Sequence, residues 1–155
     1  KTYFPNCEQV EKLVRGKGFF SFKESIENRK ECCAIRKIEP LNRALAELNA
    51  WVTGLRRDQA VTRTETPKVL EDADHPPLMK INPLADWSQE QVESYIEKHK
   101  VPVNALHKKN YPSIGCAPCT RPIEQGEDIR AGRWWWENPE HKECGLHPRG
   151  TNPTT

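Results

Sequence analysis

Two cysteines stand two residues apart in the turn Ser113-Ile-Gly-Cys-Ala-Pro-Cys-Thr-Arg-Pro122. Glycine before Cys116 and proline before Cys119 favour a tight turn that points both sulfurs the same way. A tetrahedral thiolate metal centre needs four ligands, so this pair supplies half of a site. The other half has to come from the remaining cysteines, which are Cys7, Cys32, Cys33 and Cys144.

Cys32 and Cys33 are neighbours in a stretch that we predict to be helical. Adjacent residues on a helix point about 100° apart, so the two thiols reach the separated irons of a polynuclear cluster more easily than one zinc ion. Disulfides are disfavoured because neighbouring cysteines bridge only with strain, and the chain lacks the loop-only build of disulfide scaffolds. The pattern favours an iron–sulfur centre, with a zinc-stabilised binding module as the alternative.

Cys144 stands apart from these pairs in the sequence Glu143-Cys-Gly-Leu-His147. A thiol beside a flexible glycine and basic groups can be exposed, with its thiolate favoured, so it is a candidate nucleophile. Two alternatives remain open at this point. Cys144 could be a surface thiol without a role, or a fourth metal ligand replacing Cys32 or Cys33.

Strands and helices alternate along the first two thirds of the chain, which predicts an α/β layered fold. After Val101-Pro102 the regular pattern stops, and such a long irregular segment usually carries function or needs a cofactor to hold it. We therefore divide the chain into 1–103 and a tail, 104–155, within the same structural unit. The predicted helices are 7–15, 32–38, 40–48 and 88–98, with a break before Pro40 and a capping box of Ser88 and Gln91 at the start of the last helix. The predicted strands are 50–55, 68–71 and 78–83. The polar stretch 25–31 is predicted to be a loop or a frayed helix, and the phenylalanines at 19, 20 and 22 are expected to form core rather than a binding platform.

Arg56 and Arg57 follow the first predicted strand directly. In open α/β sheets ligands bind at the carboxyl ends of the strands. Arginine there suits a phosphate or sulfate, because its guanidinium offers bidentate donors. The alternative is a solvated charged turn.

Composition narrows the classes of partner. The 155 residues are 35% hydrophobic and 30% charged with a formal net charge of +2, which predicts a soluble globular protein without general attraction to nucleic acid. Three consecutive tryptophans, Trp134–Trp136, could stack on bases, but they cannot all face one way, so we expect at least one to pack inside. No apolar run is long enough to span a bilayer.

Five motifs, in the same order, resemble the assimilatory adenylyl-sulfate reductases, the iron–sulfur branch of the adenylyl-sulfate and phosphoadenylyl-sulfate reductase family. The resemblance covers about Tyr3 to His147. The motifs are Cys32-Cys-Ala-Ile-Arg-Lys37, Trp51-Val-Thr-Gly-Leu-Arg-Arg-Asp-Gln59, Gly115-Cys-Ala-Pro-Cys-Thr-Arg-Pro122, Gly132-Arg-Trp-Trp-Trp-Glu137 and Lys142-Glu-Cys-Gly-Leu-His147.

The resemblance implies a fold and a set of roles. The fold is α/β, part of the parallel sheet with helices of the adenine-nucleotide-hydrolase-like (PP-loop) type, followed by an irregular segment rich in cysteine and tryptophan. Cys144 is implied to be the nucleophile. The implied ligands of a [4Fe–4S] cluster are Cys32, Cys33, Cys116 and Cys119, and the implied substrate-binding residues are Lys37, Gly54, Arg63, Arg130, Arg133 and His147.

The activity implied is reduction of adenylyl sulfate to sulfite and AMP in cytoplasmic sulfate assimilation for cysteine biosynthesis, through an S-sulfonate on Cys144 and with thioredoxin or glutaredoxin as reductant. A reductase for the 3′-phosphorylated nucleotide is a runner-up, which the four cluster cysteines argue against. An inactive remnant is another. Family members open with a strand and a phosphate-binding loop that do not occur here, which argues against activity of this chain by itself. Homo-oligomer formation stays open.

Overall fold

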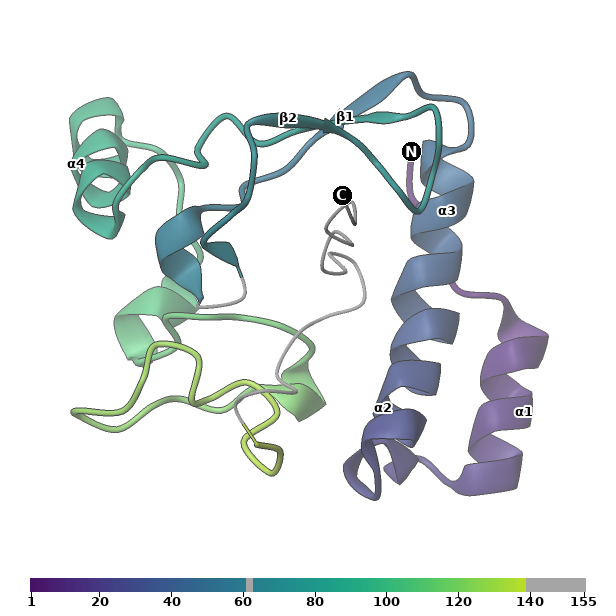
Figure 1. Cartoon of the computed structure of the whole chain (residues 1–155). Coiled ribbons are helices and arrows are strands. Elements are labelled where there is room, and N and C mark those ends of the chain that lie inside the picture. The colour runs from purple at the N-terminus through teal and green to yellow at the C-terminus, as the bar shows by residue number, and fades with distance from the viewer. Residues whose placement is uncertain (61–62, 139–155) are drawn as a thin grey trace.

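A mixed sheet of three short strands lies at one end of the protein (Figure 1). The computed structural model describes residues 1–60 and 63–138. Strand β1 (Ala50–Val52) pairs in parallel with the central strand β3 (Met79–Ile81), and β2 (Val69–Glu71) pairs antiparallel on its other side. All three predicted strands are present within their predicted ranges. Strand β1 lies at the edge of the sheet, and its Val52 is 66% exposed. The side chains of β1 are therefore less buried than those of a central parallel strand.

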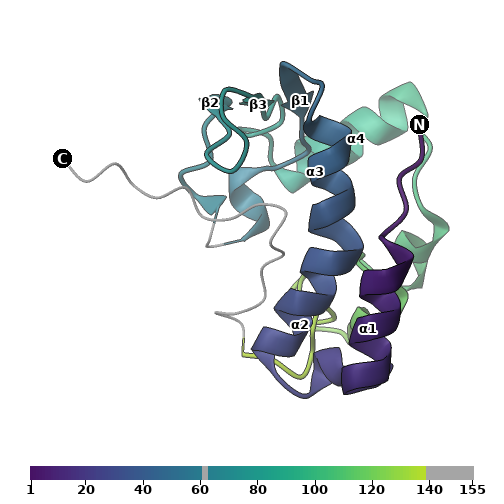
Figure 2. The same cartoon turned by 90° about the vertical axis from the view of Figure 1, so that its right-hand side faces the viewer.

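One nearly continuous helical rod leads into this sheet, with α1 (Cys7–Lys17) alongside it (Figures 1 and 2). The rod consists of α2 (Ile26–Cys33), a π-helical turn (Ala34–Ile38) and α3 (Glu39–Leu45). The predicted break before Pro40 is wrong. Proline removes one backbone donor, and the wider π turn just before it accommodates this loss without ending the helix.

Of the two alternatives for residues 25–31, a loop or a frayed helix, the structure shows a helix, because α2 begins at Ile26. The Ser25 side chain accepts a hydrogen bond from the Asn28 backbone N–H at 3.1 Å, which caps the helix. Arg29, in the middle of this polar stretch, is 1% exposed. This part of α2 therefore has a buried face, although its polar composition does not indicate one.

Helix α4 (Gln89–His99) lies at the opposite end of the sheet from the rod (Figure 1). The predicted capping box is confirmed, since the Ser88 side chain accepts from the Gln91 backbone and the Gln91 side chain accepts from the Ser88 backbone. None of the described helices is both long and apolar enough to cross a membrane.

Beyond α4 the described chain is irregular, with 3₁₀ turns at Ala105–Lys109 and Ala117–Cys119, as predicted. It packs back on the rod through a small core of Phe22, Cys119 and Trp134, against which Cys32 and Trp136 also pack. Trp134 is 1% exposed, so the prediction that one tryptophan packs inside is confirmed. The expectation that the phenylalanines at 19, 20 and 22 all form core is wrong for the first two, which are 76% and 64% exposed. The division at residue 103 stays a prediction.

Candidate active site

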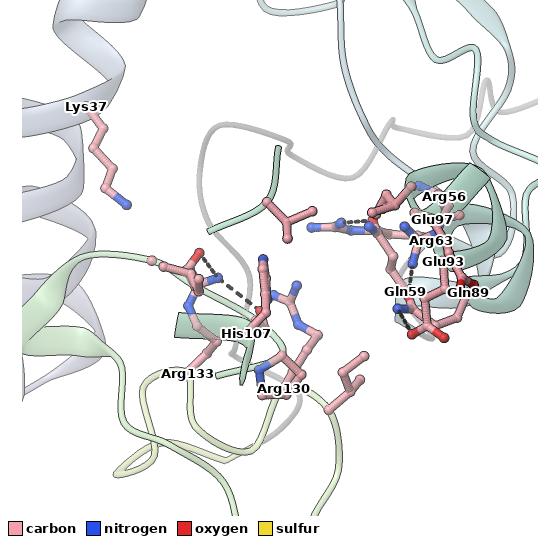
Figure 3. Close-up of a pocket in the computed structure, with 18 residues that line it drawn as sticks. Lys37, Arg56, Gln59, Arg63, Gln89, Glu93, Glu97, His107, Arg130 and Arg133 are labelled. Atoms are coloured by element: carbon pink, nitrogen blue, oxygen red, sulfur yellow. Dashed lines mark hydrogen bonds between the residues drawn. The ribbon is translucent and has the colours of Figure 1, made fainter. Parts of the chain in front are cut away.

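A cavity of about 810 Å³ lies between the rod, the loop after β1, helix α4 and the irregular segment (Figure 3). Its volume falls in the range of small-molecule sites. Four of the six residues predicted to bind substrate line it, together with Arg56. The lining therefore gathers five cationic side chains, Lys37, Arg56, Arg63, Arg130 and Arg133, against the two carboxylates of Glu93 and Glu97.

The arginines of the β1 loop are held by neutral and acidic partners. Arg56 is 8% exposed and donates to Asp58 Oδ1 at 3.1 Å and to the side-chain oxygen of Gln89 at the start of α4. Arg63 donates to Gln59 Oε1 at 2.6 Å. The loop and α4 are thereby joined, which fixes one wall of the cavity at the carboxyl end of β1, where α/β sheets place ligands.

Arg133 comes from the opposite wall (Figure 3). Its Nη1 donates to Ser113 Oγ at 3.3 Å and to the Ile114 carbonyl at 3.1 Å, and its side chain is largely buried. A β-bridge between Thr120 and Arg133 ties its backbone to the cysteine turn. The site for an anion and the turn carrying Cys116 and Cys119 are therefore built as one piece.

Lys37 extends toward the cavity from the π-helical turn of the rod (Figure 3). It lies one helical turn beyond Cys33. Its positive charge acts on both halves of the predicted metal site, because it lowers the pKa of Cys32 and of Cys119.

The structure brings Cys32, Cys116 and Cys119 together. Burial, together with the neighbouring thiols Cys116 and Cys32, raises the pKa of Cys119 to about 11. Burial likewise raises the pKa of Cys32, with Arg36 acting against it. Cys33, the last residue of α2, is also buried. The two halves of the predicted ligand set are 83 residues apart in the chain at their nearest pair, Cys33 and Cys116, yet they lie close enough for their thiols to shift one another's pKa.

Within residues 1–60 and 63–138, no three His, Cys, Asp or Glu side chains are grouped tightly enough to hold a metal ion. The four thiols are nevertheless the donors that iron–sulfur clusters use. The positive charge of Lys37 acts on both Cys32 and Cys119. The chemistry of the four thiols fits a thiolate-bound cluster, and their role as ligands stays a prediction.

Of the described residues predicted to bind substrate, only Gly54 does not line the cavity. It lies two residues beyond β1 and is exposed. Cys144 and His147 lie outside the described residues. Conversely, Ser113, Gln89 and the two glutamates of α4 line the cavity without a predicted role. Nothing in their sequence context marks them, because α4 meets the cavity only through tertiary packing.

The phosphoadenosine phosphosulfate reductase domain model matches residues 1–122, more than half of the chain. The chain belongs to this family. Among similar proteins, the adenosine 5′-phosphosulfate reductase of Allochromatium vinosum is 56% identical over 153 residues, covering 99% of this chain and 59% of that protein. The proteins of the same name from Neisseria meningitidis serogroup B and Rhizobium tropici are 54% and 50% identical. They are covered to 59% and 80% of their length, and cover 95% and 94% of this chain.

A solved structure gives the fold independently. The crystal structure of phosphoadenylyl-sulfate reductase from Candida auris, a phosphate complex, matches with a TM-score of 0.55 at 32% identity. The match covers 70% of this chain and 50% of that one. The predicted α/β fold and family resemblance are therefore confirmed. The chain spans 59% of the length of the relatives from Allochromatium vinosum and Neisseria meningitidis.

Proposed function

We propose that the protein containing this chain reduces adenylyl sulfate to sulfite and AMP. The observation that carries the proposal is the cavity that gathers Lys37 and four arginines beside the cysteine turn. Adenylyl sulfate carries negative charge on both its phosphate and its sulfate. Cations fixed in a partly enclosed site offset that charge and the charge that develops on the departing phosphate. The relatives named adenosine 5′-phosphosulfate reductase support this choice of substrate.

The chemistry proceeds through Cys144. Its thiolate attacks the sulfur of the sulfate group, a new S–S bond forms, and the bond from sulfur to the bridging oxygen breaks. AMP leaves with the electron pair, and an S-sulfonate remains on Cys144. One thiolate of a dithiol reductant, of the thioredoxin or glutaredoxin kind, then attacks Cys144 Sγ and releases sulfite. The second thiol of the reductant restores Cys144, so two electrons pass from the dithiol to the sulfate sulfur.

We infer further that Cys32, Cys33, Cys116 and Cys119 would hold a [4Fe–4S] cluster. Such a cluster would supply an electrostatic contribution beside the anion site. Lys37 lines the cavity, and its charge also acts on Cys32 and Cys119. It can therefore couple the cluster to the bound substrate. A reaction that needs free thiols fits a reducing compartment such as the cytoplasm.

Serine at Cys116 tests the cluster. We expect Cys116→Ser, after anaerobic purification, to lose most of the iron and acid-labile sulfide and the brown visible absorbance of the parent protein. Cys7→Ser is the matched control, because Cys7 is exposed on α1 and should leave all three unchanged. A colourless parent protein that contains zinc in place of iron contradicts the cluster and favours the zinc-stabilised module.

Methionine at Arg63 tests the anion site. We expect Arg63→Met to weaken AMP binding, measured by calorimetry, about 10- to 100-fold, because a charge-assisted hydrogen bond contributes roughly 1.5–3 kcal/mol. Arg15→Met is the control, since Arg15 is exposed on α1, where it pairs with Glu11 at 3.0 Å. The proposed function fails if AMP binds equally well to both variants or does not bind the parent protein.

The 3′-phosphorylated nucleotide is a second candidate substrate, favoured by the match to the Candida auris enzyme. Competition calorimetry with AMP and adenosine 3′,5′-bisphosphate separates the two. We expect AMP to bind more tightly. Tighter binding of the bisphosphate would reassign the substrate without removing the anion site.

A further inference from the structure

The guanidiniums of two arginines, Arg29 and Arg133, lie over the indole ring of Trp134. Cζ of Arg133 lies 4.5 Å from the ring centroid, and Cζ of Arg29 lies 4.7 Å from it. The ring is 1% exposed and packs in the core with Phe22 and Cys119. The attraction between a guanidinium and an aromatic face is strongest when both are withdrawn from water, as they are here.

The backbone of Trp134 adopts a conformation that is unusual for a bulky residue, with φ at +42°. L-residues with large side chains rarely occupy this left-handed region, and such a conformation persists only where its surroundings enforce it. Two hydrogen bonds do so: Trp134 N donates to the Cys119 carbonyl at 3.1 Å, and the Trp134 carbonyl accepts from Glu137 N at 2.8 Å. The backbone at Trp134 is therefore held against the cysteine turn, and its ring packs beside Cys119.

Arg29 reaches this ring from helix α2 but does not line the cavity. Its side chain is 1% exposed, and its Nε donates to Glu137 Oε1 at 2.5 Å, where the carboxylate is 4% exposed. A fully buried ion pair fixes the guanidinium in one orientation. Arg29 can thus affect an anion in the cavity only through the residues that it contacts.

Arg133 is limited on its other side by Gly115. A Cβ atom at Gly115 would lie 2.6 Å from Arg133 Nη2, so the guanidinium rests directly against the glycine backbone. Trp134 and Gly115 together restrict where Arg133 can place its donors. A residue that holds Trp134 therefore holds Arg133 as well.

We propose that Arg29 is a positioning residue for anion binding: it orients the ring of Trp134, and the ring orients Arg133 in the cavity. The proposal rests on the proposed function, in which the cavity binds the phosphosulfate group. It adds a buried residue of α2, three positions before Cys32, to the anion site. The juxtaposition of Glu137, Arg29, Trp134 and Arg133 carries it.

A double-mutant cycle on AMP affinity tests this role. Arg29→Met combined with Glu137→Met removes the buried pair while keeping volume, which avoids leaving one charge unpaired. We expect this double variant to weaken AMP binding about tenfold in the parent protein and hardly at all when Arg133→Met is already present. A residue that serves only the stability of the fold would lower affinity equally in both backgrounds, and that result overturns the proposal.

Two further variants keep the test decisive. Arg29→Lys keeps the charge and can still pair with Glu137, but it lacks the planar group that stacks on the ring, so it remains folded and is expected to weaken AMP binding about threefold. Arg121→Met with Glu127→Met removes the partly exposed arginine–glutamate pair of the same segment, held at 2.7 Å, and should leave AMP affinity unchanged. Parent protein that does not bind AMP overturns the proposed function. Binding by the parent with unchanged affinity in every Arg29 variant overturns only the positioning role.

Discussion

Arg29→Ala is expected to lower the free energy of unfolding by about 3–5 kcal/mol, because it leaves the Glu137 carboxylate buried without its partner. The pair is almost completely withdrawn from water, with side chains 1% and 4% exposed. It also joins α2 to the end of the described irregular segment, across 108 residues of sequence. Urea denaturation followed by circular dichroism measures the loss.

Arg121→Ala provides the comparison for that experiment. Arg121 pairs with Glu127 through two hydrogen bonds, but the two side chains are 32% and 30% exposed. Solvent screens such a pair, so its loss should cost far less than the loss of the buried pair. If Arg29→Ala costs no more than Arg121→Ala, the buried pair does not anchor the irregular segment.

Cys144→Ser is expected to abolish release of sulfite from adenylyl sulfate, a loss on the order of 10⁴-fold or more, since removing a nucleophile generally removes the covalent route altogether. The assay uses the full parent protein with excess dithiol reductant. AMP affinity should remain near that of the parent, because the cavity is formed by other residues. Cys7→Ser should retain sulfite release. Sustained release by Cys144→Ser would assign the nucleophile to another group.

The local elements could be read from the sequence because their signals are local. Ser88 and Gln91 form the predicted capping box, and the apolar, β-branched runs became β1, β2 and β3. Short-range chemistry of this kind needs only neighbouring residues. The same holds for the irregular segment, which lacks periodicity and has no regular helix or strand after α4 in the part that the structure describes.

The errors concern burial that only tertiary contacts decide. Arg29 belongs to a polar stretch that gave no helical pattern, yet it is buried because Glu137 and Trp134 meet it from the far end of the chain. Phe19 and Phe20 are apolar but exposed, since only Phe22 points into the core. Partners so distant in sequence leave no mark in a window of neighbouring residues.

The candidate site was partly accessible from sequence for a different reason. The family resemblance implies Lys37, Arg63, Arg130 and Arg133 as substrate-binding residues, and the structure places all four around one cavity. For Arg56 the sequence indicates only a charged residue at the end of a strand. For the lining residues of α4 it indicates no role in the site. Motifs mark residues that share chemistry, whereas lining residues such as Gln89 depend on how α4 docks against the loop after β1.

The most direct measurement is peptide mapping of the full parent protein by mass spectrometry after incubation with adenylyl sulfate in the absence of any thiol. The account predicts one sulfonate group per chain, located on Cys144, and its release as sulfite when dithiol is added. A sulfonate on any other cysteine, or AMP formation that leaves every cysteine unmodified, would contradict it.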